Sequence, residues 1–147
     1  MDDRIMALMR VMRIAGQAAA AMMLFVGAGA DAQSLKTLRA QEAEEAALDR
    51  EAAFTSSVCG TQINARIDWR SAADWPEGVS LAEACDGALG AVEAVCRADA
   101  SRTSRISSFV CAGDGAGPDL SGATLRYGAS PGGNGFSETR AYLESAL

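Results

Sequence analysis

The sequence contains no histidine and a single lysine, Lys36. Without an imidazole, neither a Ser-His-Asp triad nor a Cys-His pair can form, and the commonest nitrogen ligand for metals is missing. The lysine is not part of a Gly-Lys-Ser/Thr motif, which excludes a P-loop for nucleotide phosphates. We therefore expect no bound cofactor and no metal site.

Positive charge is also scarce. Among 147 residues, 13 are basic and 19 are acidic, so the formal net charge is −6. Nucleic acids and anionic membranes are bound mainly through lysine and arginine. The charge balance therefore predicts that neither is a partner of this protein.

Residues 1–32 have the three parts of a secretory signal peptide. Arginines precede an uncharged stretch over residues 14–26, and an Ala-x-Ala cleavage motif ends at Ala32. The apolar run is shorter than the ~20 residues of a membrane-spanning helix. We therefore expect cleavage after Ala32, no membrane anchor afterwards, and a periplasmic or secreted product. The excess of arginine over lysine is typical of a GC-rich bacterial genome, and translation from Met1 or from Met9 stays open.

Residues 33–56 are rich in alanine, glutamate and leucine, which are strong helix formers. The apolar residues of this segment do not fall on one clean stripe, and acidic residues cluster in its middle (Glu42, Glu44, Glu45). We expect a solvated helical arm that leads into a domain over residues 57–147. The alternative is a helix that binds a partner.

The domain begins with a strand and a helix. Ile63, Ala65, Ile67 and Trp69 alternate with polar residues, which is the period-two pattern of a half-buried strand. A Ser-x-x-Glu capping box at Ser80 then precedes a run of apolar residues spaced by three and four, as on one face of a helix.

The second half of the domain is expected to contain two strands and a helix. Strands are predicted over residues 105–111 and 123–127, separated by a glycine-rich loop over 113–122. Ser137 can cap a terminal helix.

Four cysteines in a small exported chain indicate two disulfides. Cys85 and Cys96 lie on the same predicted helix with their Cα atoms ~16 Å apart, whereas a disulfide tolerates at most ~7 Å. If the first strand and this helix run antiparallel, Cys59 lies near Cys96 and Cys111 lies near Cys85. The chain path therefore favours the pairs Cys59–Cys96 and Cys85–Cys111.

The same path makes the first two strands parallel, joined through the helix by a right-handed crossover. The third strand is expected to form an antiparallel hairpin with the second. The predicted fold is α+β: a three-stranded mixed sheet in a strand-helix-strand-strand core, packed on a central helix, with flanking helices and two disulfides.

Paired carboxylates can act as catalytic groups without histidine. A pair of them can hydrolyse glycosidic bonds, and Asp68, Glu83, Asp86 and Glu93 are available. Glu83 is already explained by the capping box, and the pattern does not single out two of the four. A small carboxylate hydrolase is therefore an alternative, and no catalytic residue is assigned.

Two tryptophans stand close together in the chain, on or after the first predicted strand. Trp69 continues the inward alternation, and Trp75 falls in a loop, where a large aromatic side chain either covers the core or contacts a partner. Arg66 and Arg70 are close in sequence and can add polar or cation–π contacts. We expect a non-enzymatic binding module whose candidate surface contains Trp69, Trp75, Arg66 and Arg70. Its partner would be an envelope or extracellular protein; a third alternative is an envelope-associated structural protein that self-associates through the helix over residues 33–56.

Overall fold

The computed structural model describes residues 27–147, with side chains from Ala32 onward. Most of the expected signal peptide, residues 1–26, lies outside the described residues. The described residues fall into two units that divide between Arg39 and Ala40, and helix α1 (Gly27–Cys59) contributes to both. In the first unit, the described side chains are exposed to solvent. Within residues 27–147, no helix combines the length and the apolar character needed to cross a bilayer.

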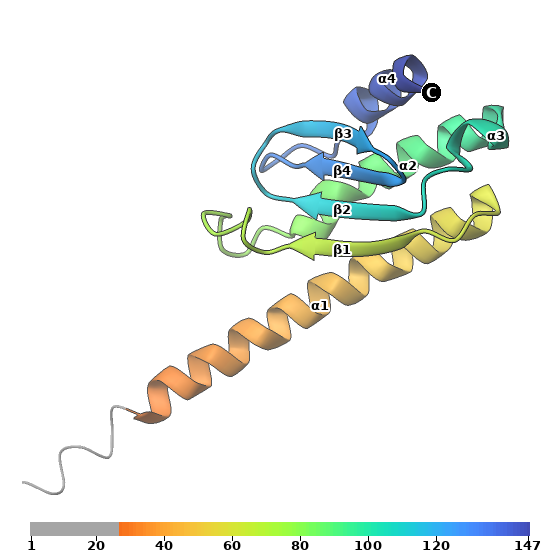
Figure 1. The fold of residues 1–147 in the computed structure, drawn as a ribbon. Helices are drawn as coiled ribbons and strands as arrows, with labels where there is room; N and C mark the ends of the chain where they lie inside the picture. Colours follow the sequence, from red (N-terminus) through yellow and green to blue (C-terminus); the bar gives the residue numbers. More distant parts are fainter. Residues whose placement is uncertain (1–26) are drawn as a thin grey trace, which may run out of the picture. The chain divides into compact units, whose positions relative to one another are not determined.

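The second unit has an α+β fold that contains one mixed sheet. Its strands are β1 (Asn64–Asp68), β2 (Ser108–Ala112), β3 (Gly117–Ser121) and β4 (Thr124–Gly128). They lie in the order β1-β2-β4-β3 (Figure 1). β1 and β2 are parallel, as the chain path predicts, with Asn64 beside Ser108.

The fourth strand corrects the predicted topology. β3 occupies the segment expected to be a loop, and it forms the antiparallel hairpin with β4. β4 consequently runs parallel to β2 and not antiparallel to it. The segment Gly117–Ser121 resembles a loop because it contains glycine, proline and aspartate, residues that are depleted in strands. A strand at the edge of a sheet tolerates proline, because its outer side makes no ladder hydrogen bonds.

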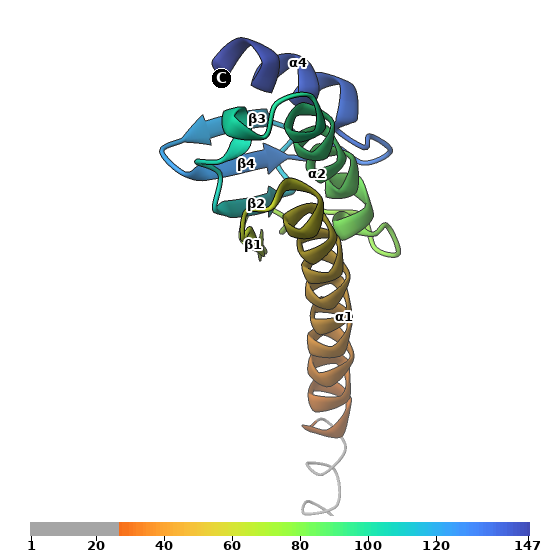
Figure 2. The same cartoon turned by 90° about the vertical axis from the view of Figure 1, so that its right-hand side faces the viewer.

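The helices of this unit cover one face of the sheet and leave the other open (Figure 2). They are the part of α1 from Ala40 onward, α2 (Leu81–Ala98) and α4 (Phe136–Ala146), while α3 (Ala100–Thr103) is a short turn after α2. Phe109, Leu125 and Tyr127 of the central strands are buried beneath these helices. The core therefore lies between the sheet and a single helical layer.

The end of α1 is part of this core. Leu48, Ala52, Thr55 and Cys59 are all at least 93% buried, and their spacing of four, three and four places them on one face of the helix. This corrects the expected solvated arm for the last part of residues 33–56. The sequence pattern does not reveal this buried face, because it is made of small and polar residues together with one leucine.

The N-terminus of α2 is capped from two directions. The Ser80 hydroxyl accepts a hydrogen bond from the Glu83 N–H at 3.1 Å, as the capping box predicts. The carboxylate that accompanies it belongs to Glu44 of α1, which accepts from the Ser80 hydroxyl at 2.9 Å and from the Ala82 N–H at 2.8 Å. α1 thus supplies an acceptor for one of the amides that a helix leaves unpaired in its first turn.

Two disulfides attach α2 to its neighbours at opposite ends. Cys59 at the end of α1 is bonded to Cys96, and Cys85 is bonded to Cys111 of β2. These are the pairs that the chain path favoured. Each closes a loop of intermediate length and is expected to stabilise the fold by ~3–4 kcal/mol in the chain-entropy view.

Candidate functional site: the free edge of β1

The four residues expected to form a binding surface lie on β1 and in the loop that follows it, but they do not form one surface. Trp69 and Trp75 are half-buried against the core. The Trp69 Nε1 donates to Glu45 Oε1 at 2.7 Å, and the Trp75 Nε1 donates to the Val79 carbonyl at 2.9 Å. Both indoles are therefore held by the fold itself. Arg66 and Arg70 are exposed, and alternation along β1 places Arg66 on the open face, opposite to the core.

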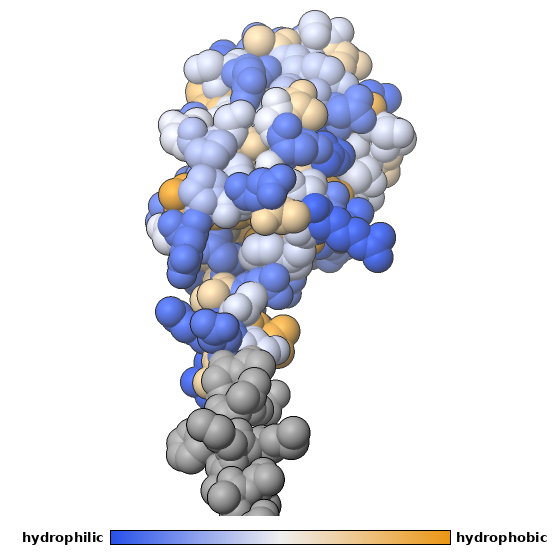
Figure 3. All heavy atoms as spheres, turned by 90° about the vertical axis from the view of Figure 1, so that its left-hand side faces the viewer, coloured by the Kyte–Doolittle hydropathy of each residue, from blue (hydrophilic) through white to orange (hydrophobic). Residues whose placement is uncertain are grey.

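The surface around the carboxyl ends of β1, β2 and β4 has no large apolar patch. Figure 3 shows this side of the second unit, where apolar side chains of the described residues form only small separate spots among hydrophilic ones. The loop that carries Trp75 belongs to this side of the sheet. An aromatic contact surface centred on Trp75 is therefore a weaker candidate than another feature of β1, its outer edge.

The carboxylates considered for hydrolysis have other surroundings. Glu83 and Asp86 are exposed on α2. Glu93 accepts a hydrogen bond from the buried Thr55 hydroxyl at 2.9 Å and pairs with Arg97 at 3.4 Å. Asp68 lies 3.9 Å from Arg126 across the open face.

Glu51 of α1 is an acidic neighbour that the sequence pattern did not reveal. Partial burial, together with the nearby Asp86 and Glu93 carboxylates, raises the pKa of Glu51. This cluster lies on the surface between α1 and α2, and its members do not line the groove described below. It is therefore an exposed acidic surface and not a built catalytic pair.

The two edges of the sheet differ sharply. β3 forms one edge, and both of its outward positions are blocked. Pro118 has no N–H to offer, and the Leu120 N–H donates to the Tyr142 hydroxyl of α4 at 2.7 Å. Proline and covering side chains are two ways in which proteins prevent another chain from pairing with an edge strand.

β1 forms the other edge, and its outward backbone groups are unoccupied. The Asn64 N–H donates to the Ser107 carbonyl at 3.0 Å, so the backbone of Asn64 points toward β2. Because backbone direction alternates along a strand, the N–H and C=O groups of Ala65 and Ile67 point away from β2. Within residues 27–147, these groups have no hydrogen-bond partner.

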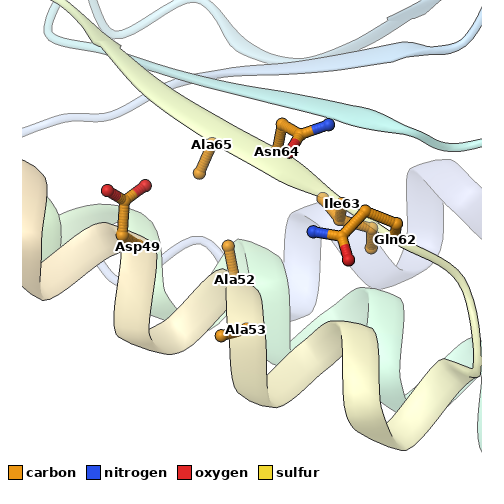
Figure 4. A pocket seen from close by; sticks show the side chains of 7 residues that line it. All are labelled: Asp49, Ala52, Ala53, Gln62, Ile63, Asn64 and Ala65. Atoms are coloured by element: carbon orange, nitrogen blue, oxygen red, sulfur yellow. The ribbon is translucent and has the colours of Figure 1, made fainter.

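A groove runs beside this edge, between β1 and α1. It has a volume of about 260 Å³, and Asp49, Ala52 and Ala53 form its helical wall. Residues 62–65 form the opposite wall (Figure 4). In this view the Ala65 methyl group points toward the helix, and the Asp49 carboxylate extends from the helix toward the strand.

The start of the groove is closed by α1. The Ile63 N–H donates to the Ser56 Oγ at 2.9 Å, so the backbone just before β1 is occupied. The free part of the edge therefore begins at Ala65. The side chains of Ala52 and Ala53 are small and project little from the helix at this point, which leaves room beside the strand.

Charge around the edge differs between the two faces of the sheet. On the helix side, Asp49 and Glu45 are exposed acidic residues. On the open face, Arg66 is exposed, and Arg126 pairs with Asp114 at 2.5 Å. This ion pair holds the loop before β3 against the sheet. The Arg126 guanidinium also lowers the pKa of Asp114.

This edge was not identified from the sequence pattern, although part of its signal is present. β1 contains neither proline nor lysine, whereas the segment that becomes β3 contains Pro118. The protection of Leu120 by Tyr142 depends on the packing of α4 and has no local signature. No protein-family model matches the chain, and no curated protein or solved structure matches it.

Proposed function

We propose that this protein is an exported binding module that captures an extended segment of another polypeptide by adding it as a strand to β1. The observation that carries the proposal is the contrast between the two edges. β3 is closed by Pro118 and Tyr142, whereas β1 is open beside a groove. Strand addition to an exposed sheet edge is a recurring mode of peptide recognition.

The free backbone groups supply affinity that does not depend on side chains. Ala65 and Ile67 together offer two donors and two acceptors. Each hydrogen bond contributes about 0.5–1.5 kcal/mol net, so these bonds at most roughly offset the cost of association. Side chains that enter the groove must provide the rest and the specificity.

Both walls of the groove are held in place before a partner arrives. Cys59 ends α1 a few residues before β1, and its disulfide to Cys96 attaches this corner to α2. Glu44 attaches α1 to the beginning of α2. A preformed groove lowers the ordering cost of binding.

The compartment is inferred from the cysteines together with the signal-peptide pattern. All cysteines among the described residues are in disulfides, which persist in oxidising compartments such as the periplasm and the extracellular space. We therefore propose that the partner is an envelope or extracellular protein with an accessible extended segment.

Selection from a random peptide library tests the proposal. Phage-displayed peptides of about ten residues, long enough to form a strand, are panned against the oxidised protein. Selected peptides are then titrated into ¹⁵N-labelled protein. We expect the amide signals of Ala65 and Ile67 to shift and gain protection from exchange, while Leu120 on the closed edge stays unchanged. A library that yields no peptide with this signature contradicts the proposal.

Two variants block the edge in different ways. Ala65→Pro copies the feature seen at Pro118 and removes an outward donor, so it should weaken a selected peptide by about tenfold. Ala53→Phe fills the groove from its exposed helical wall and should have the same effect. Ala43→Phe, at an exposed position of α1 that does not line the groove, is the matched control. Unaltered near-UV circular dichroism establishes that each variant is folded.

Pairing of β1 with a second copy of the chain is the competing outcome. Light scattering would then show a dimer that Ala65→Pro converts to a monomer. That result would replace a separate partner with self-association.

A further inference from the structure

We infer that the groove beside Ala65 receives a lysine or arginine side chain of the incoming strand. This inference rests on the proposed function, because it assumes that a strand pairs with β1. It adds the chemical class of the segment that binds.

Strand geometry determines which incoming side chain meets the groove. In paired strands, residues directly opposite each other project from the same face of the sheet. The Ala65 side chain projects toward α1 (Figure 4). The residue opposite Ala65 therefore projects into the space bounded by Asp49, Ala52 and Ala53.

The lining of the groove suits a long side chain with a positive end. The methyl groups of Ala52, Ala53 and Ala65 provide a small apolar surface for an aliphatic stem. Lysine and arginine characteristically place their methylene groups on such surfaces while the charged end stays in contact with water. The exposed Asp49 carboxylate lies at this wall and forms no ion pair within residues 27–147. It is therefore available as the counter-charge.

The neighbouring position on the incoming strand has the opposite preference. Its side chain projects from the open face, beside Arg66, which is exposed and unpaired among the described residues. Like charges directly opposite each other in a sheet are destabilising. The incoming strand thus matches the charges of both faces when a basic residue lies opposite Ala65 and an acidic or neutral residue lies opposite Arg66. This charge pattern determines the register in which the strand pairs with β1.

The test uses the peptides selected on the edge of β1. We expect those that shift the Ala65 amide to be enriched in lysine or arginine at one position. Replacing that residue with norleucine, which keeps the stem and removes the charge, should weaken binding about two- to fivefold. Replacing it with glutamate should cost about tenfold, and about 0.5 M NaCl should reduce both differences.

Protein variants assign the effect to the groove. Asp49→Asn should bind the lysine and norleucine peptides equally, while Glu77→Gln, at an exposed acidic position in the loop after β1, should preserve the preference. If selected peptides bind β1 without a basic preference, or if the preference survives in Asp49→Asn, the inference is overturned while the proposed function stands. If no peptide binds β1, the proposed function fails and this inference fails with it.

Discussion

The Glu44 carboxylate of α1 accepts a hydrogen bond from the Ala82 N–H in the first turn of α2, at 2.8 Å. The same oxygen accepts from the Ser80 hydroxyl. A negative charge at this position satisfies an otherwise unpaired amide and interacts favourably with the positive end of the helix dipole. The contact connects two segments 38 residues apart in the chain and holds the helical wall of the groove.

Glu44→Gln should therefore lower the free energy of unfolding by about 0.5–2 kcal/mol, because it removes the charge from the helix terminus and weakens the acceptor. Urea denaturation measures the change. Glu42→Gln alters an exposed acidic residue of the same helix and should change stability by less than about 0.5 kcal/mol. Equal effects of the two substitutions would contradict the capping role.

Gly135→Ala should destabilise the protein by about 2–4 kcal/mol, from backbone strain and overpacking together. Gly135 has φ +73°, and a Cβ atom there would lie 2.7 Å from the Tyr127 hydroxyl oxygen. That hydroxyl donates to Glu138 in the first turn of α4, so the clash acts on a packed part of the fold. Thermal or urea unfolding measures the loss.

Gly132→Ala is the matched control for this clash. Gly132 has a similar φ of +82°, but a Cβ atom at this position would meet no other atom within 4 Å. Its cost should be limited to the backbone term of about 1 kcal/mol. A loss at Gly132 as large as that at Gly135 would show that the Tyr127 ring is not the cause.

The two disulfides should differ in their effect on the groove. Replacing Cys59 and Cys96 together with alanine should lower stability by ~3–4 kcal/mol and raise amide exchange at residues 49–53. Replacing Cys85 and Cys111 should cost a similar amount but leave α1 attached to the end of α2 through the other bond. Hydrogen exchange with mass spectrometry distinguishes the two; identical exchange in the helical wall would contradict this assignment.

Asp114 should contribute a pH-dependent stabilisation. Arg126 lowers the pKa of Asp114 in the folded protein below its ordinary value of 3.8. The contribution is therefore present above about pH 4 and is lost as pH falls through the folded-state pKa. Since the Arg126 and Asp114 side chains are 31% and 38% exposed, solvent screens the pair, and Asp114→Asn should cost at most about 1 kcal/mol at neutral pH. Wild type and variant should converge in acid. Urea titrations across this pH range would reject the assignment if the difference did not shrink as the pH falls.

Glu51 should show the opposite sign. Partial desolvation and the Asp86 carboxylate raise the pKa of Glu51 above its ordinary value of 4.5. Ionisation is then less favourable in the folded state, so stability decreases as pH rises from the unfolded-state pKa through the folded-state pKa. Glu51→Gln should slightly stabilise the protein at neutral pH and have no benefit in acid. A loss of stability in this variant at neutral pH would contradict the raised pKa of Glu51.

The local elements of the fold were predictable from short stretches of sequence. Alternation from Ile63 to Trp69 indicated β1, and the capping box at Ser80 with its apolar face indicated α2. The disulfide pairs could be favoured because two cysteines on one helix cannot reach each other, and the chain path brought the others to opposite ends. These features depend on residues within a few positions of one another, on distances along one helix, or on the order in which strands and helices follow along the chain.

The sheet order and the candidate site depended on contacts between distant residues. β3 is a strand because it pairs with β4, and its edge is closed because Tyr142 reaches Leu120 from 22 residues away. The sequence alone predicts that Glu44 and Thr55 are solvated helix residues, but in the fold both form hydrogen bonds with α2. Likewise, Ala52 and Ala53 became a groove wall only because α1 passes beside the unpaired edge of β1.

The sequence by itself thus determined that histidine-based chemistry is absent, where the main strand and helix begin, and that Cys85 cannot pair with Cys96. Only the tertiary structure decided which edge of the sheet is closed and which is open. The physical reason is that periodicity and caps are properties of neighbouring residues, whereas the availability of a backbone N–H depends on whether any other part of the chain reaches it. For Leu120 a tyrosine does so, and for Ala65 no described residue does.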